Sequence, residues 1–75
     1  MKTKEKRQYT AAMRYRTAVR LNRTDHSQYG NSGFIIRVLE NRSEDRRNQW
    51  YDVLFENGVY GRFQEADLEQ IELTE

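Results

Sequence analysis

The chain has 75 residues, of which 36% are hydrophobic and 33% are charged, so it can form one small domain with a thin core. It has no cysteine, which excludes a disulfide framework and thiolate metal ligands. No segment reaches the roughly 18 apolar residues of a membrane helix, and no signal-peptide pattern opens the chain, so we expect a cytoplasmic protein. Three Phe, five Tyr and one Trp distinguish the composition from a disordered one.

The net charge of +1 conceals an asymmetry along the chain. Residues 1–23 contain eight basic groups and one acidic group, whereas residues 24–75 contain five basic and eleven acidic groups. A basic segment of this kind suits a polyanionic partner such as nucleic acid. The alternative is a solvated tail that docks on the acidic remainder of the same chain.

The first quarter of the chain contains an arm and then an ambiguous segment. Residues 1–9 have no apolar periodicity, which predicts a disordered arm. Residues 10–22 fit two structures, because Met13 and the two alanines before it favour a helix, whereas the alternation that begins at Tyr15 is typical of a half-buried strand. We predict a strand over about 15–22, preceded by a helical turn.

The middle of the chain alternates loops and strands. Residues 23–32 are polar and contain Gly30, which predicts a loop. Residues 33–40, "GFIIRVLE", and 49–55, "QWYDVLF", are rich in β-branched and aromatic types, which predicts two strands. Between them, the charged residues 41–48 predict a surface loop without a core residue.

A hairpin signal follows the third strand. Asn57-Gly58 is typical of a tight turn in which both residues take a positive φ. The next segment, "VYGRF", predicts a fourth strand with Gly61 at a bulge or bend. After a short turn, Ile71 and Leu73 alternate with polar residues and predict a fifth, closing strand.

The period-2 alternation also predicts which side chains form the core. Along the third strand, it directs Tyr51, Val53 and Phe55 inward and Trp50, Asp52 and Leu54 outward. The side chains that we expect to be largely buried are Val19, Leu21, Ile36, Val53 and Phe55. Closure of five short strands into a barrel would remove the sheet edges, which is a usual arrangement for a small all-β chain.

Gly30 and Gly33 raise the question of a phosphate-binding loop. Such a loop needs a helix N-terminus directly after the glycines, so that backbone amides point at the anion. The residues that follow Gly33 are Phe34, Ile35 and Ile36, which predict a strand instead. We therefore interpret the pair as structural, supplying positive φ and close backbone approach at a turn.

Five sequence features follow one another in a recognisable order. They are V-x-L at 19–21, G-x-x-G-x-I at 30–35, Y-x-V-x-F at 51–55, Asn57-Gly58, and D-L-E at 67–69. This order resembles an SH3-like small barrel of the KOW and Tudor-like type. The resemblance implies an all-β fold in which a five-stranded SH3-like barrel, residues 14–75, follows a basic and flexible N-terminal arm, residues 1–13. The basic residue that usually precedes the first family glycine is Tyr29 here.

The candidate contact residues are basic and aromatic. Arg14, Arg16 and Arg20 share one face if residues 14–20 are extended, and such a face suits phosphates, although a solvated face paired with carboxylates fits equally. Trp50, directed outward, could stack on a base or fill a partner pocket, or it could close one end of the core. The full candidate set is Arg14, Arg16, Arg20, Tyr29, Arg37, Arg46, Arg47 and Trp50.

Catalytic and metal-binding patterns are absent from the sequence. His26 is the only histidine and lies in a polar loop, where we expect it to be solvated. The acidic residues lack calcium-loop spacing, so we interpret Glu65, Asp67, Glu69 and Glu72 as a solvated acidic edge. We predict no enzymatic activity, no cofactor, no metal site, no membrane association and no small-molecule substrate.

Two binding functions remain. The first is a non-catalytic module for nucleic acid, either RNA or single-stranded DNA, because KOW-like relatives commonly act on RNA or in transcription and translation complexes. The alternative is a protein–protein adaptor. Barrels similar to this one dock on RNA polymerase in repair helicases and hold an electron carrier in photosynthetic assemblies, and the acidic remainder of this chain suits that role.

Overall fold

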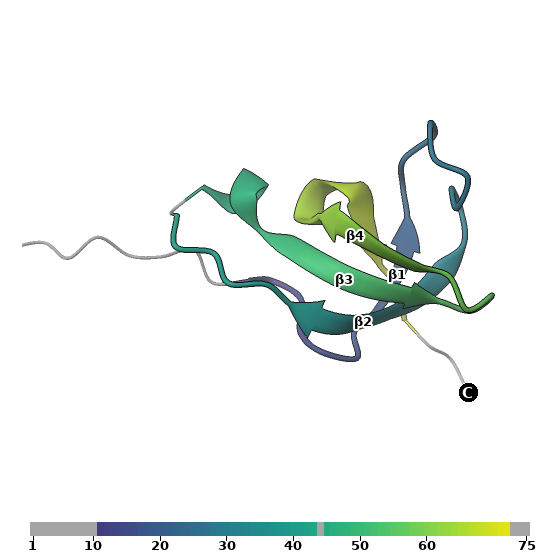
Figure 1. The fold of residues 1–75 in the computed structure, drawn as a ribbon, viewed down its shortest axis with the longest axis horizontal. Coiled ribbons are helices and arrows are strands. Elements are labelled where there is room, and N and C mark those ends of the chain that lie inside the picture. The colour runs from purple at the N-terminus through teal and green to yellow at the C-terminus, as the bar shows by residue number, and fades with distance from the viewer. Residues whose placement is uncertain (1–10, 44, 73–75) are drawn as a thin grey trace, which may run out of the picture.

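A computed structural model describes residues 11–43 and 45–72 of the chain, and the predicted arm over residues 1–9 lies outside these ranges. The described residues form five β-strands and two three-residue 3-10 helices (Figure 1). In chain order, the elements are β1 (Ala18–Leu21), β2 (Ser32–Val38), η1 (Arg46–Asn48), β3 (Trp50–Phe55), β4 (Tyr60–Gln64), η2 (Glu65–Asp67) and β5 (Leu68–Gln70).

The five strands form one antiparallel sheet with the order β4-β3-β2-β1-β5. The predicted all-β class with five strands is therefore confirmed. Within residues 11–43 and 45–72, no backbone pairing joins β4 to β5, so these two strands are the edges of the sheet. The five-stranded antiparallel arrangement is compatible with an SH3-like small β fold.

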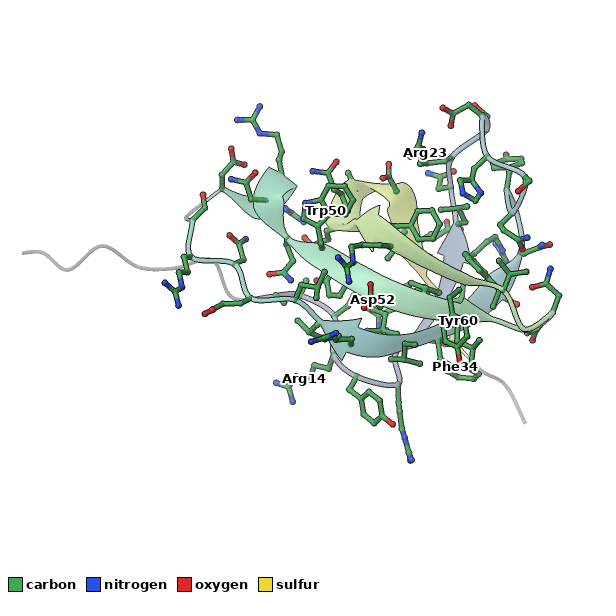
Figure 2. All side chains as sticks on the ribbon, viewed as in Figure 1. Arg14, Arg23, Phe34, Trp50, Asp52 and Tyr60 are labelled. Atoms are coloured by element: carbon green, nitrogen blue, oxygen red, sulfur yellow. The ribbon has the colours of Figure 1, made fainter. Side chains whose placement is uncertain are left out.

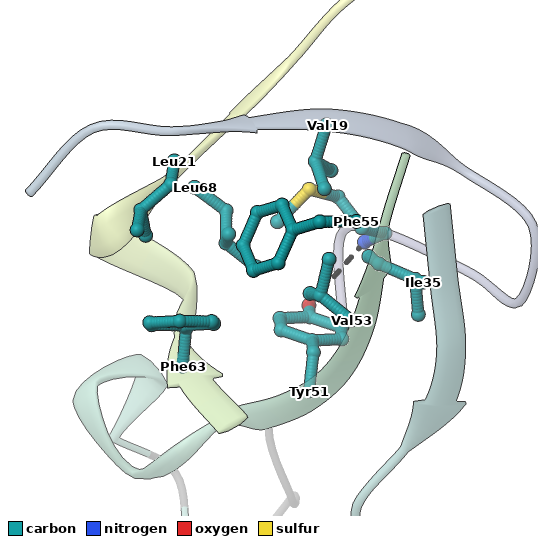
Figure 3. Packing of buried hydrophobic residues seen from close by; sticks show 9 residues of the cluster. Val19, Leu21, Ile35, Tyr51, Val53, Phe55, Phe63 and Leu68 are labelled. Atoms are coloured by element: carbon teal, nitrogen blue, oxygen red, sulfur yellow. Dashed lines mark hydrogen bonds between the residues drawn. The ribbon is translucent and has the colours of Figure 1, made fainter. Parts of the chain in front are cut away.

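One face of the sheet encloses the core, to which every strand contributes at least one side chain (Figure 3). The buried cluster consists of Met13, Val19, Leu21, Ile35, Tyr51, Val53, Phe55, Phe63 and Leu68. Four of the five predicted core residues belong to it. Met13, from the last position of the predicted arm, is also in the cluster, with 5% of its surface exposed.

The prediction for Ile36 is wrong, because Ile35 is the buried residue and Ile36 is only half-buried. The cause is a β-bulge in β2. Ile35 pairs with Val53, and the next pair joins Arg37 to Asp52, so Ile36 is an extra residue without a partner on β3. A bulge adds one residue to the strand and changes the direction of the side chains beyond it. As a result, Arg37 pairs with a residue that points away from the core.

The strand predicted over about 15–22 is shorter, because residues 14–17 form a turn before β1. The amide of Thr17 donates to the carbonyl of Arg14 at 3.0 Å, and Arg16 has a φ of 74°. The amide of Arg16 donates to the carbonyl of Ile35 at 2.6 Å, which attaches this turn to the side of β2. A left-handed arginine is strained by roughly 1–2 kcal/mol, and the tertiary bond to Ile35 offsets part of that strain.

The hairpin between β3 and β4 lies where the Asn57-Gly58 signal places it. Its geometry differs from the predicted one, because Gly58 has a φ of 85° and Asn57 has no positive φ. The amide of Gly58 donates to the carbonyl of Phe55, and the amide of Phe55 donates to the carbonyl of Val59, both at 2.9 Å. This is the three-residue type of loop, in which a left-handed glycine follows an ordinary turn.

Gly61 and the last strand also differ from prediction. Gly61 pairs regularly with Val53 and is not at a bulge. A Cβ on Gly61 would lie 2.4 Å from the ring of Phe63, so this glycine makes room for a core aromatic ring. The closing strand is Leu68–Gln70 rather than the segment containing Ile71, because the η2 turn directs Leu68 into the core. Leu73 lies outside the described residues.

The two glycines before and within β2 have structural roles, as predicted, but different ones. Gly30 has a φ of 82° at the end of the β1–β2 loop, and a Cβ added at this position would have no atom within 4 Å. Gly33 lies inside β2, where a Cβ would be 2.3 Å from the carbonyl oxygen of Leu54 and 2.7 Å from the Cα of Phe55. Only Gly33 is therefore required for close approach of two backbones.

This difference predicts opposite effects for two substitutions. Gly33→Ala should destabilise the fold by about 1–3 kcal/mol or more, because the added methyl group overlaps backbone atoms that cannot rotate away. Gly30→Asn should change stability by less than about 1 kcal/mol, because asparagine tolerates a positive φ and the site is open. Urea unfolding of both variants measures the two effects, and a fully stable Gly33→Ala protein would contradict the close approach of β2 and β3.

Candidate functional site

Most arginine side chains of the described residues are neutralised by a neighbouring carboxylate. Nine arginines lie in residues 11–43 and 45–72, and six of them form ion pairs. The pairs are Arg20–Glu69, Arg23–Asp25, Arg42–Glu40, Arg46–Glu65, Arg47–Asp45 and Arg62–Asp52, with N–O distances of 2.6 to 3.3 Å. Three of the predicted contact residues, Arg20, Arg46 and Arg47, are therefore already paired with acids.

The pair of Arg47 with Asp45 is formed within one short segment. The guanidinium and the backbone amide of Arg47 both donate to this carboxylate, which lowers the pKa of Asp45 to about 2. Asp45 is therefore ionised at neutral pH, and Arg47 is compensated locally. Arg46, by contrast, pairs with Glu65, nineteen positions away.

Arg14, Arg16 and Arg37 are the arginines of the described ranges that have no ion pair. Arg14 and Arg16 lie in the turn before β1, and the guanidinium carbon of Arg16 lies 5.3 Å from the centroid of the Tyr15 ring. The condition for a shared face with Arg20 is not met, because residues 14–17 are not extended. Instead, the bond from Arg16 to the carbonyl of Ile35 brings the turn close to the bulge and to Arg37.

The face of the sheet opposite the core carries an apolar row across three strands. Phe34 on β2 pairs with Leu54 on β3, which in turn pairs with Tyr60 on β4. Phe34 is 40% exposed and Tyr60 is 68% exposed, and Figure 2 labels both toward the same end of the sheet. We call Phe34, Leu54 and Tyr60 the outer strip.

A charged row runs beside the outer strip. Arg37, Asp52 and Arg62 pair across the same three strands, and Arg62 donates to Asp52 at 2.7 Å. The hydrogen bond from Arg62, assisted by the charges of Arg62 and Arg37, lowers the pKa of Asp52 below its ordinary value. Asp52 is therefore ionised at neutral pH and compensates Arg62, so Arg37 supplies the surplus positive charge of this row.

A shallow depression lies between the outer strip and the charged row. It has a volume of about 360 Å³ and is lined by Ile36, Asp52, Tyr60, Gly61 and Arg62. Its walls combine an aromatic ring and an aliphatic side chain with a guanidinium and a carboxylate. This combination suits a flat polar ring that is stacked on one side and hydrogen-bonded at its edge.

The two remaining candidate residues lie apart from this region. Trp50 is on the outer face at the opposite end of β3 from Leu54, paired with Gln64 and 38% exposed. Figure 2 shows Asp52 between the region of Trp50 and that of Tyr60. Tyr29 is exposed in the loop between β1 and β2. The structure therefore does not join the predicted residues into one surface.

The interpretation of His26 as a solvated loop residue is wrong. Its ring packs edge-on against Phe63, with centroids 5.1 Å apart and an interplanar angle of 74°. Its Nδ1 accepts a hydrogen bond from the amide of Gln28 at 3.0 Å, so the side chain is half-buried and organises the loop. Sequence alone could not place the loop over the ring of Phe63.

The interpretation of Glu65 as part of a solvated acidic edge is also wrong, because its residue surface is only 7% exposed. The Tyr51 hydroxyl donates to Glu65 Oε1 at 2.6 Å, and Arg46 donates two hydrogen bonds to Oε2 at 2.8 and 3.2 Å. The amide of Ala12 also donates to Oε1, at 3.4 Å. In turn, the amide of Met13 donates to the Tyr51 hydroxyl at 3.4 Å, the dashed line in Figure 3. This carboxylate is structural, because its contacts fix the segment before β1 against the core.

The sequence patterns do not identify the outer strip as a site. They select only Trp50 among the outward aromatic residues of the strands, although the expected alternation also directs Leu54 outward. A period-2 analysis of all strands would have placed Phe34 and Tyr60 on the same face as Leu54. It could not have shown that they are in register, because register depends on the turn geometry and on the bulge.

Comparison of the chain with known protein families, with curated proteins and with solved structures gives no match. Within residues 11–43 and 45–72, no helix has the length and apolar character that a membrane crossing requires. The same part of the chain contains no group of three or more His, Cys, Asp or Glu side chains arranged to hold a metal ion.

The buried position of Glu65 predicts that its hydrogen-bond donors stabilise the fold. Tyr51→Phe should reduce the free energy of unfolding by about 1–3 kcal/mol, because a buried carboxylate then loses a donor. Tyr60→Phe is the matched control and should change stability by less than about 0.5 kcal/mol, because the Tyr60 side chain is exposed. Equal stability of the two variants in urea unfolding would show that the Tyr51 hydroxyl does not support Glu65.

Proposed function

We propose that this chain is a non-catalytic nucleic-acid-binding module built on an SH3-like small β fold of the KOW or Tudor-like type. The observation that carries the proposal is the position of the three arginines that have no ion pair within residues 11–43 and 45–72. Arg14 and Arg16 lie in the turn attached to β2, and Arg37 lies just beyond the bulge of the same strand.

An unpaired arginine differs from a paired one in what an anion gains from it. A phosphate that approaches a paired arginine must compete with the carboxylate that already compensates it. Arg14, Arg16 and Arg37 form no ion pair within the described ranges, so their guanidinium groups are available for charge-assisted hydrogen bonds to phosphate. The basic groups of residues 1–10, Lys2, Lys4, Lys6 and Arg7 against Glu5, add to the same electrostatic attraction.

A protein–protein adaptor is the second candidate. The observation that favours it is the charge balance of residues 11–43 and 45–72, where nine arginines face nine acidic residues. A surface with no net charge attracts a polyanion weakly over long distances, whereas it accepts a protein partner without penalty. Pull-down with and without nuclease treatment separates the two candidates, because only an adaptor retains its partner after nuclease.

The proposal predicts a specific change in salt dependence. Replacement of Arg14, Arg16 and Arg37 together by Ala should weaken binding to an oligonucleotide. The slope of log affinity against log salt should fall by about two to three, because about three fewer phosphates are neutralised. Fluorescence anisotropy at several salt concentrations measures this slope.

A matched control has the same change in net charge. Replacement of Arg23, Arg42 and Arg47 by Ala removes three arginines that are each paired with a carboxylate. We expect a smaller effect on the slope from this variant. Equal slopes for the two triple variants would contradict the argument from ion pairing, and absence of binding by the unmodified protein at low salt would contradict the proposed function.

A further inference from the structure

We propose that the ligand is single-stranded nucleic acid, and that its bases stack on Phe34 and Tyr60 of the outer strip. This inference rests on the proposed function and specifies its substrate class and its site. It assigns base stacking to the end of the outer face that carries Phe34 and Tyr60, rather than to Trp50.

The first step of the argument is the register of the strands. Phe34, Leu54 and Tyr60 form one row across β2, β3 and β4, so the two rings are two strand spacings apart, about 10 Å. Leu54, which is half-buried, lies between them as an apolar floor. Two exposed rings on a rigid sheet are a surface on which unpaired bases stack, and every base has a face suited to it.

The second step is the position of the charge. The bulge at Ile36 turns Arg37 to the outer face, beside the strip, and the depression next to Tyr60 is lined by Arg62. Close to Arg37, the bond from Arg16 to Ile35 fixes the turn with Arg14 and Arg16 against β2. The stacking surface is therefore bordered by Arg14, Arg16 and Arg37, which form no ion pair within the described residues. These three cations are complementary to the phosphates of a strand whose bases occupy the strip.

The strain at Arg16 fits this arrangement. A non-glycine residue with a φ of 74° is unfavourable, and nothing in the core requires an arginine at this position. The turn gives the exposed Tyr15 and the Arg16 guanidinium stacked on it a fixed place beside β2. A pre-formed cation at the border of the strip reduces the ordering cost of binding.

The third step concerns the form of the ligand. Bases in a duplex are stacked on each other and cannot lie flat on Phe34 or Tyr60, so a duplex can use only the arginines. A single strand can use the rings as well. The outer strip therefore predicts a preference for single strands that depends on the aromatic side chains, whereas binding to a duplex does not.

The test compares two ligands and uses three variants of the full chain together with the unmodified protein. A fluorescent twelve-residue oligothymidylate and a duplex of the same length are titrated at constant low salt. The double variant Phe34→Leu, Tyr60→Leu should bind the single strand about 5- to 150-fold more weakly and the duplex about as well as the unmodified protein. Restoration of one ring, with Tyr60→Phe in place of Tyr60→Leu, should recover part of the lost affinity for the single strand.

The design also includes a Trp50→Leu variant and a sedimentation measurement of self-association. Equal affinity of the double variant and the unmodified protein for the single strand, with duplex binding intact, overturns the stacking site and leaves the proposed function standing. If Trp50→Leu loses single-strand binding and the double variant does not, the stacking site is at Trp50 and the proposed site on the outer strip is overturned. Absence of binding to both ligands overturns both proposals and leaves the strip to a protein partner. Self-association that the double variant abolishes, measured by sedimentation, assigns the strip to a second copy of the chain.

Discussion

The buried carboxylate of Glu65 is the interaction on which the arrangement of this small domain depends. An ionised carboxylate removed from water is strongly unfavourable unless it is paired and hydrogen-bonded. Within the described residues, three donors come from separate parts of the chain: Arg46 in η1, Tyr51 in β3 and Ala12 before β1. Because all three must converge on one group, few alternative packings of the same residues satisfy it. In a core of so few side chains, this requirement supplies specificity that apolar contacts alone do not.

The inner and outer faces of the sheet are coupled by the bulge at Ile36. The inner face needs Ile35 in the core opposite Val53, and regular alternation would then direct Arg37 inward as well. The extra residue removes this conflict, since it keeps Ile35 buried and turns Arg37 to the outer face. The bulge thus lets one short strand, β2, supply a core side chain, an exposed aromatic ring and an uncompensated cation.

Features that depend on local sequence pattern could be predicted from the sequence. Features that depend on contacts between residues distant in the chain could not. The alternation in β3 and the hairpin at Gly58 are local, and both are confirmed in position. The bulge at Ile36 is not local, because only the pairing with β3 shows that one residue is extra. The burial of Glu65 depends on donors up to 53 positions away, and which arginines keep their charge depends on which carboxylates the fold places beside them. The sequence therefore showed where the charged residues are, but not which arginines are paired with a carboxylate in the fold.

The pairing of β1 with β5 has a consequence for the order in which the chain acquires structure during synthesis. β1 ends at Leu21, whereas one of its two neighbouring strands, β5, spans Leu68–Gln70. Val19 of β1, for example, pairs with Gln70 of β5. The hairpin of β3 and β4 is complete once Gln64 has been made, whereas β1 keeps an unsatisfied edge until residues 68–70 have left the ribosome. Glu65 is synthesised almost as late. A nascent chain that lacks residues 68–70 therefore has an exposed edge on β1 and a core without Leu68.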